Sequence, residues 1–149
     1  MSLDDNRRLY RRWLLELWNG DLAVADQVVT PDFVGSWPGR PGLVHGPGEL
    51  VETIRMSREL FLDLTFAVEG GPVADGDLVA ARWIGRGRYK GGMPGATAPA
   101  GTPVSLGGHD LLRVEGGRFA EYWVISETEH LAAQLQGGQE AAGPGEAGR

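Results

Sequence analysis

The chain has 149 residues, a formal net charge of −6 and no cysteine. This length suffices for one domain with a hydrophobic core, and the acidity argues against a nucleic-acid partner. The lack of cysteine excludes disulfides and thiol chemistry, and no apolar run reaches the roughly 18 residues that a membrane span needs. The charged start MSLDDNRRLY lacks the apolar run of a signal peptide, so we expect a cytoplasmic location.

Helices are predicted mainly in the first part of the chain. An amphipathic helix is expected over 3–19, because its apolar residues recur at helical spacing. These residues are Tyr10, Trp13, Leu14, Leu17 and Trp18. Asn19-Gly20 ends this helix. Further helices are expected over 21–29, 49–60 and, near the end of the chain, 129–135.

Strands are predicted mainly in the second half. A short strand over 32–37 is followed by a half-buried, alternating strand over 62–68. The turn Asp75-Gly76-Asp77 leads into a long strand over 78–89. Residues 90–101 are too rich in glycine and proline for a regular element, and a loop of this length often forms a lid or a pocket rim.

The last two predicted strands form a hairpin over 104–127, with turn chemistry at Glu115-Gly116-Gly117. A bulge at the glycines would bring Arg113 opposite Glu121 and place Asp110 near Val124. Side chains alternate along a strand. One face therefore carries Asp110, Leu112, Tyr122, Val124 and Ser126, and the other carries His109, Leu111, Arg113, Glu121, Trp123 and Ile125.

Helices early and strands late predict an α+β fold with a curved antiparallel sheet and N-terminal helices over its concave face. Such a cone-shaped α+β barrel has an apolar interior in which a pocket can form. The predicted domain spans 1–136. Residues 137–149 read as a disordered, glycine-rich tail.

Five stretches resemble the SnoaL-like polyketide cyclases of the nuclear-transport-factor-2-like superfold. They are WNGDL (18–22), TPDFV (30–34), DGDLVAARW (75–83), GHDLLRV (108–114) and GRFAEYW (117–123). The resemblance covers residues 9 to about 127. It implies a cone-shaped pocket, no metal, no organic cofactor, and acid/base chemistry on a polyketide-like small molecule. Members of this fold commonly pair through the outer sheet face, so the resemblance also implies a homodimer.

The chain departs from the family pattern at the positions that carry the chemistry. The family's aspartate follows the tryptophan of an E-H-W-D stretch, and here that position is Val124. Two histidines frequent in the family fall at Tyr122 and Ser36, and a third falls at Asp110. A carboxylate has thus moved across the hairpin, from 124 to 110, if the chain is a cyclase.

Asp110 is the first candidate for catalysis, because a carboxylate on an apolar wall has a raised pKa that suits a general acid or base. The alternative is a strand-end aspartate bonded to the backbone or to Arg82. Tyr122 is a candidate donor to a developing oxyanion, and Arg82 a candidate partner that orients Asp110. His109 points away from Asp110 by parity, unless a bulge at Gly107-Gly108 turns it inward.

The predicted substrate-binding walls are Trp37, Tyr89, Met93, Trp13, Leu112 and Val124. No spacing of acidic residues and histidines indicates a metal site. The leading interpretation is a cofactor-independent cyclase or isomerase of polyketide or natural-product biosynthesis. Two alternatives stay open: an epoxide-opening cyclase or hydrolase of the same superfold, and a small-molecule-binding protein that has lost the chemistry with the family aspartate.

Overall fold

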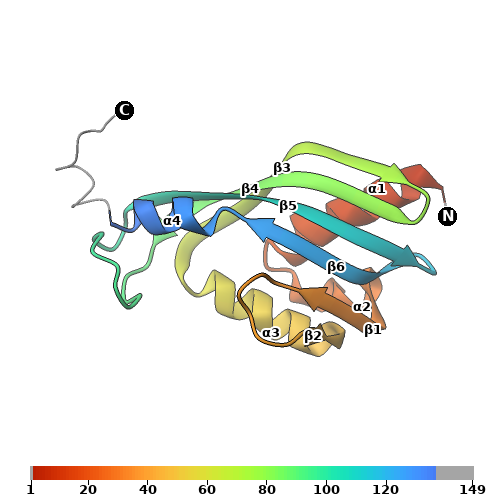
Figure 1. The fold of residues 1–149 in the computed structure, drawn as a ribbon, viewed down its shortest axis with the longest axis horizontal. Helices are drawn as coiled ribbons and strands as arrows, with labels where there is room; N and C mark the ends of the chain where they lie inside the picture. Colours follow the sequence, from red (N-terminus) through yellow and green to blue (C-terminus); the bar gives the residue numbers. More distant parts are fainter. Residues whose placement is uncertain (1, 137–149) are drawn as a thin grey trace.

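The computed structural model describes residues 2–136, which form N-terminal helices, a six-stranded sheet and a C-terminal helix (Figure 1). The predicted tail over 137–149 lies outside the described residues. In chain order the elements are α1 (Leu3–Arg11), the π-helix η1 (Arg12–Leu17), the 3-10 helix η2 (Leu22–Val24), α2 (Ala25–Val28), β1 (Val29–Ser36), β2 (Val44–His45), α3 (Gly46–Arg58), β3 (Phe61–Asp75), β4 (Leu78–Tyr89), β5 (Pro103–Glu115), β6 (Arg118–Ser126) and α4 (Thr128–Gln134).

The strands are ordered β2-β1-β6-β5-β4-β3 in one curved sheet. All neighbours are antiparallel except β1 and β6, which are parallel. The predicted α+β fold with a curved sheet is confirmed, and the one parallel pair makes this sheet mixed where an antiparallel sheet was expected. The parallel pair arises because β1 follows the first helices and joins the free side of β6, far along the chain. The sheet does not close, and the α+β cone predicted from the sequence is open on one side.

The first helix does not stay α-helical over its whole length. Ser2 caps α1, its Oγ accepting the Asp5 N–H at 3.0 Å. From Arg12 to Leu17 the helix widens into a π-helix, and the N–H of Trp18 donates to the carbonyl of Trp13 at 3.1 Å, five residues back. In an α-helix, residues five apart point about 140° away from each other. Because the π-helix has a wider turn, the Trp13 and Trp18 side chains point to more nearly the same side of the helix.

Two other boundaries differ from expectation. Strand β3 continues to Asp75 rather than ending at 68, because it pairs with β4 through register shifts around Gly70 and Gly71-Pro72. These residues break the apolar alternation, so the pattern ends before the strand does. The second difference is at β1, which starts at Val29, where a helix was expected to end.

The β5–β6 hairpin has the predicted faces and most of the predicted register. Asp110 lies opposite Val124, and Arg113 opposite Glu121, whose Oε1 accepts the Arg113 Nε–H at 2.6 Å. The loop is one residue shorter than expected, since Glu115 pairs with Arg118, and the bulge falls between Arg113 and Val114. The faces are unaffected by this shift. Asp110 thus points into the molecule.

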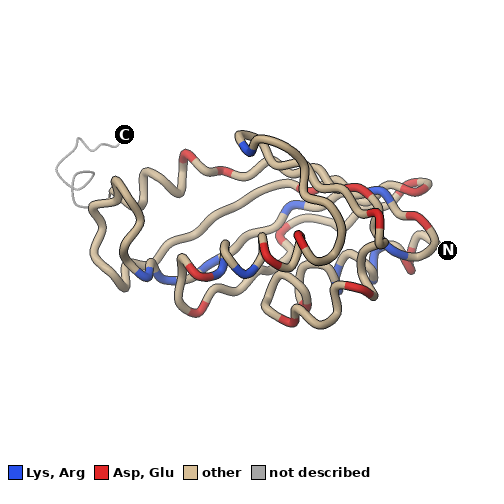
Figure 2. Tube along the Cα trace, turned by 90° about the horizontal axis from the view of Figure 1, so that it is seen from below, with Lys and Arg blue, Asp and Glu red and all other residues tan. Residues whose placement is uncertain are grey.

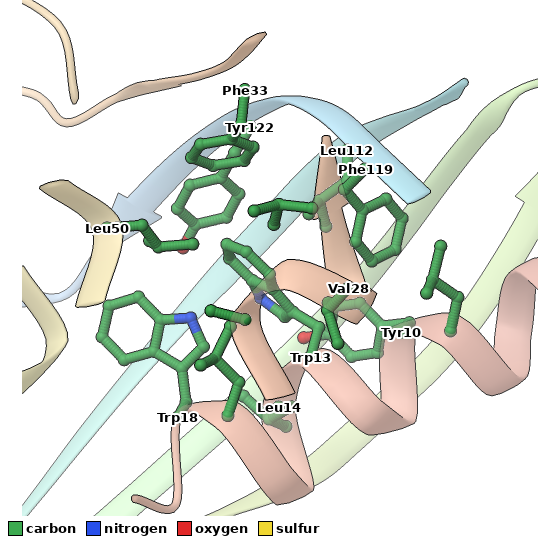
Figure 3. Packing of buried hydrophobic residues seen from close by; sticks show 14 of the residues in the cluster. Tyr10, Trp13, Leu14, Trp18, Val28, Phe33, Leu50, Leu112, Phe119 and Tyr122 are labelled. Carbon is green, nitrogen blue, oxygen red and sulfur yellow. The ribbon is translucent and has the colours of Figure 1, made fainter. Parts of the chain in front are cut away.

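Aromatic side chains fill the space between the N-terminal helices and the sheet (Figure 3). Trp13 is fully buried at the centre, with the Tyr122 ring centroid 4.7 Å from its own. A second, smaller cluster of Tyr89, Ala98, Val104 and Leu135 joins the β4–β5 loop to α4. The end of the molecule formed by this loop is nearly free of charge (Figure 2), because residues 91–109 contain no Lys, Arg, Asp or Glu.

Candidate active site

Asp110 is a buried carboxylate that three neutral side chains hold. Its Oδ1 accepts hydrogen bonds from Trp83 Nε1 at 2.9 Å and from the Tyr122 hydroxyl at 2.8 Å, and its Oδ2 accepts one from the Tyr10 hydroxyl at 2.9 Å. Only 3% of the residue is exposed. The donors come from α1, β4 and β6, so the site exists only when helix and sheet are packed together. Oδ2 has one partner where Oδ1 has two, and it therefore keeps more capacity to accept a proton.

Burial raises the pKa of Asp110 from 3.8 to about 6, because the charged form loses its hydration. The hydrogen bonds from Tyr122, Tyr10 and Trp83 oppose this shift by favouring the ionised form. The Trp13 indole beside the carboxylate also lowers the pKa, although its N–H is not in hydrogen-bond geometry. Within residues 2–136 no Lys, Arg or His forms an ion pair with Asp110.

The two tyrosines remain protonated. Burial raises the pKa of Tyr122 well above its usual value of 10, and the negative charge of Asp110 raises it further. The same two causes raise the pKa of Tyr10. Both hydroxyls are therefore neutral donors at physiological pH, and neither is a general base. The ionisable group of the cluster that changes charge near neutral pH is Asp110.

A cavity of about 180 Å³ opens beside this cluster. Its wall is mostly aromatic and aliphatic, and Asp110 is the one carboxylate among the described residues that line it. The lining residues are Trp13, Leu14, Trp18, Trp37, Ser57, Phe61, Leu64, Phe66, Trp83, Gly85, Gly87, Val104, Ser105, Leu106, Asp110, Tyr122, Val124, Ser126, Thr128 and Leu131. An apolar cavity with few polar groups is typical of small-molecule sites.

Several residues singled out in the sequence meet at this cavity. Asp110, Tyr122, Trp13, Trp37 and Val124 all line it. Leu112 is fully buried on the same face of the hairpin but belongs to the core rather than to the cavity wall.

Tyr89 and Met93 do not line the cavity, contrary to expectation. They lie in the second cluster, where the Met93 N–H donates to the Tyr89 hydroxyl at 2.7 Å. Tyr89 is at the end of β4, beyond the residues of this strand that line the cavity, and Met93 is in the loop that follows.

Arg82 and His109 lie on the opposite, outer face of the sheet, where they are cross-strand neighbours. Arg82 forms ion pairs with Glu69 and Glu127 at 2.6 and 3.3 Å. The expected contact between Arg82 and Asp110 is therefore not formed. No bulge turns His109 inward, and its side chain is exposed.

Tyr10 and Trp83 were not recognised as parts of the site. From the sequence, Tyr10 is named only as an apolar helix residue and Trp83 only as part of a strand. Apolar periodicity gives no sign that the Tyr10 hydroxyl and the Trp83 indole N–H bond to Asp110. Gly108 is a signal for Trp83: it lies opposite this residue in the register, and a Cβ built on it would come within 2.3 Å of the indole. The missing side chain at Gly108 thus leaves the space that the Trp83 indole occupies.

Comparison with known proteins places the chain in a family. The sequence profile of the SnoaL-like polyketide cyclases matches residues 8–135. The chain belongs to the SnoaL-like polyketide cyclase family. A search of curated protein sequences found no match.

Solved structures of related chains agree with this assignment. TsrD from Streptomyces laurentii has 26% identity and a TM-score of 0.76, over 91% of this chain and 97% of its own. IdmH from Streptomyces antibioticus, described as a candidate polyketide cyclase, has 29% identity and a TM-score of 0.69, over 81% and 91%. A candidate polyketide cyclase from Acidithiobacillus ferrooxidans, at 23% identity and a TM-score of 0.78 over 92% and 99%, supports the fold alone.

The SnoaL-like chain departs from the pattern that the resemblance predicts at a position on the cavity wall. Val124 stands where the resemblance predicts an aspartate, and Asp110 is its direct cross-strand partner. Both side chains line the same cavity. Among residues 2–136, no group of three or more His, Asp or Glu side chains could hold a metal ion, and no helix is long and apolar enough to cross a membrane.

Proposed function

We propose that this SnoaL-like protein is a cofactor-independent cyclase or isomerase that acts on a polyketide-like ketone, with Asp110 as the group that transfers the proton. The observation that carries the proposal is a single buried carboxylate, with a pKa raised to about 6, on the wall of a mostly apolar cavity. A base with a pKa just below neutral is largely ionised at pH 7 and still accepts a proton readily.

The proposed step begins with the carboxylate removing a proton from a carbon next to a carbonyl group. The electron pair of the broken C–H bond forms an enolate. In a cyclase the enolate carbon attacks a second carbonyl of the same molecule, a C–C bond forms, and the resulting alkoxide takes the proton back from Asp110. In an isomerase the proton returns to a different carbon. Either way substrate and product have the same composition.

Tyr122 would assist through a change of hydrogen-bond partner. While Asp110 is ionised, the Tyr122 hydroxyl donates to it. A protonated carboxyl group is a weaker acceptor, so the hydroxyl becomes available to an enolate oxygen at the moment that this oxygen acquires charge. Because Tyr122 lines the cavity, it is placed to make this contact.

The test needs only a ketone with acidic α-hydrogens. Purified protein is mixed with 2-tetralone in D₂O, and the exchange of its α-hydrogens is followed by NMR. We expect exchange well above the buffer rate, and its loss in Asp110→Asn. Arg82→Gln is the matched control, since Arg82 lies on the outer face and should leave the rate unchanged. Full exchange in Asp110→Asn would refute the assignment of the base.

The second candidate is a protein that binds such molecules without reacting with them. The hydrogen bonds to Asp110 favour it, because three donors already hold the carboxylate. Binding of 2-tetralone without exchange would support this alternative. An epoxide-opening mechanism with an arginine between two acids has less support, because Arg82 is bonded to Glu69 and Glu127 on the other face.

We also propose that the protein forms a homodimer through the outer face of the sheet. Leu111, Trp123 and Ile125 lie there with 39%, 39% and 63% of their surface exposed. Large apolar side chains gathered on one exposed face are typical of an interface.

A further inference from the structure

The indole N–H of Trp18 is a buried hydrogen-bond donor that has no acceptor among residues 2–136. Trp18 is 8% exposed and lines the cavity. A buried donor without a partner costs about 1–3 kcal/mol, and native structures rarely leave one without a reason. The cavity offers the reason if a bound molecule supplies the missing acceptor.

The surroundings of this indole explain why the protein supplies none. Its neighbours are the rings of Trp13, Trp37 and Phe66, with centroids 6.0, 6.4 and 5.9 Å away. Figure 3 shows its nitrogen on the side of the ring that faces Trp13 and Tyr122. Tyr122 is one of the donors to Asp110. Trp13 has an unpartnered Nε1 as well, but that indole lies beside Asp110 and lowers its pKa. Trp18 has no such partner.

The π-helix gives this placement its cause. Trp13 and Trp18 are joined by the five-residue hydrogen bond of η1, and the wider turn presents both indoles to the cavity. A regular α-helix would turn one of them aside by about 140°. Such π-turns occur often at functional sites, where a less stable helix is kept for the position of a side chain.

We infer that the Trp18 indole N–H binds a carbonyl oxygen of the substrate, in the same cavity in which Asp110 meets the carbon to be deprotonated. The ligand class is an aromatic or polycyclic ketone, because the donor lies among flat rings and can bond only to an acceptor. This inference depends on the proposed function only in taking the cavity as the substrate site.

The first measurement is the ¹H–¹⁵N spectrum of the indole groups, with Trp18 assigned by its loss in Trp18→Phe. Titration with 2-tetralone should move the Trp18 signal downfield, as a new hydrogen bond does. Tetralin has the same carbon skeleton without the oxygen, and it should not cause this shift. An unmoved Trp18 signal at millimolar 2-tetralone, or no binding of the ketone at that concentration, would overturn the inference.

The second measurement is the ratio of the affinities for 2-tetralone and tetralin. Losing one hydrogen bond in Trp18→Phe should reduce this ratio about five- to tenfold. Trp37→Phe is the matched control, because it removes the same volume from the same cavity; it should weaken the binding of both ligands alike. An unchanged ratio in Trp18→Phe would mean that the N–H contacts only the neighbouring rings.

The two proposals fail in different ways. A Trp18 shift without α-hydrogen exchange would leave the hydrogen bond standing and refute Asp110 as the base. Exchange that depends on Asp110, without a Trp18 shift, would leave Asp110 standing as the base and refute the hydrogen bond from Trp18.

Discussion

Asp110 combines two opposing effects in one residue. Burial disfavours the charged form of Asp110, while hydroxyl and indole donors favour it. The pKa rises to about 6 because the effect of burial is the larger one. No cation among the described residues compensates. The protein therefore keeps a costly group in its core, which is typical of a functional site rather than a structural one.

This cost predicts how stability depends on pH. Below about pH 3.8 Asp110 is protonated in both the folded and the unfolded state, and it contributes no difference. Between pH 4 and 6 the folded state holds more protons than the unfolded state, so the free energy of unfolding falls as pH rises. A shift from 3.8 to about 6 corresponds to about 3 kcal/mol lost by pH 7.

Asp110→Asn should remove this loss. The amide oxygen can accept from Trp83 and Tyr122 as Oδ1 does, and the amide nitrogen can donate to the Tyr10 oxygen. In urea unfolding at several pH values, we expect the free energy of unfolding of the variant, relative to that of the wild type, to increase from pH 4 to 7. A constant difference between the two proteins over this range would contradict the raised pKa.

The two tyrosines can be separated by their pH profiles. Tyr10 donates to Asp110 but does not line the cavity, whereas Tyr122 does both. Tyr10→Phe should move the rising limb of α-hydrogen exchange about one pH unit upward and leave its plateau nearly intact. Tyr122→Phe should show the same shift and also a lower plateau. Equal plateau rates in Tyr10→Phe and Tyr122→Phe would contradict the role of Tyr122 as a donor to the oxyanion.

At the scale of elements, the hairpin was the part of the fold best predicted from sequence. Alternation and one charge pair were enough to place Asp110 opposite Val124, and an error of one residue in the loop left the faces unchanged. Register is robust there because slipping by one residue would expose Leu112 and Tyr122. The candidate walls at Tyr89 and Met93 do not line the cavity, because Tyr89 ends β4 and Met93 lies in the loop after it, where both join the second cluster.

The pairing of distant elements could not be predicted in the same way. The parallel contact of β1 with β6 and the π-turn in the first helix depend on packing against the rest of the molecule. Tyr10 was missed for this reason: its hydrogen bond to Asp110 spans 100 residues, and no local pattern connects them.

The hairpin register predicts that the carboxylate can be moved between strands. Asp110→Val should abolish α-hydrogen exchange of 2-tetralone. Adding Val124→Asp should restore part of it, at least about tenfold above the single variant, because cross-strand partners on one face lie about 5 Å apart. If the double variant is folded by circular dichroism and stays inactive, position 110 is needed for more than supplying a carboxylate to this cavity.

For the whole molecule, the two faces of the sheet have different surroundings. The inner face holds the cavity, and the outer face carries Leu111, Trp123 and Ile125 beside ion pairs such as those of Arg82. Because the cavity lining and the outer apolar side chains point to opposite faces, assembly and catalysis should be separable by mutation.

Ile125→Glu tests the dimer. A buried glutamate at a self-complementary interface meets its own copy, so the variant should sediment as a monomer at concentrations where the wild type is a dimer. Met56→Glu is the matched control, since Met56 is also largely exposed, at 59%, but lies on α3 and not on the sheet. A wild type that sediments as a monomer, or a variant that remains a dimer, would refute this interface.

The pairing of Asp110 with Val124 also bears on how such a site can change over evolutionary time. At these two positions, a sequence with the carboxylate on β6 and a sequence with it on β5 would differ by two substitutions. If the new aspartate comes first, every ancestor along that route has an acid in the cavity. An alignment that compares one position at a time would count the substitution at 124 as the loss of the acid. The carboxylate at 110 lines the same cavity from the neighbouring strand.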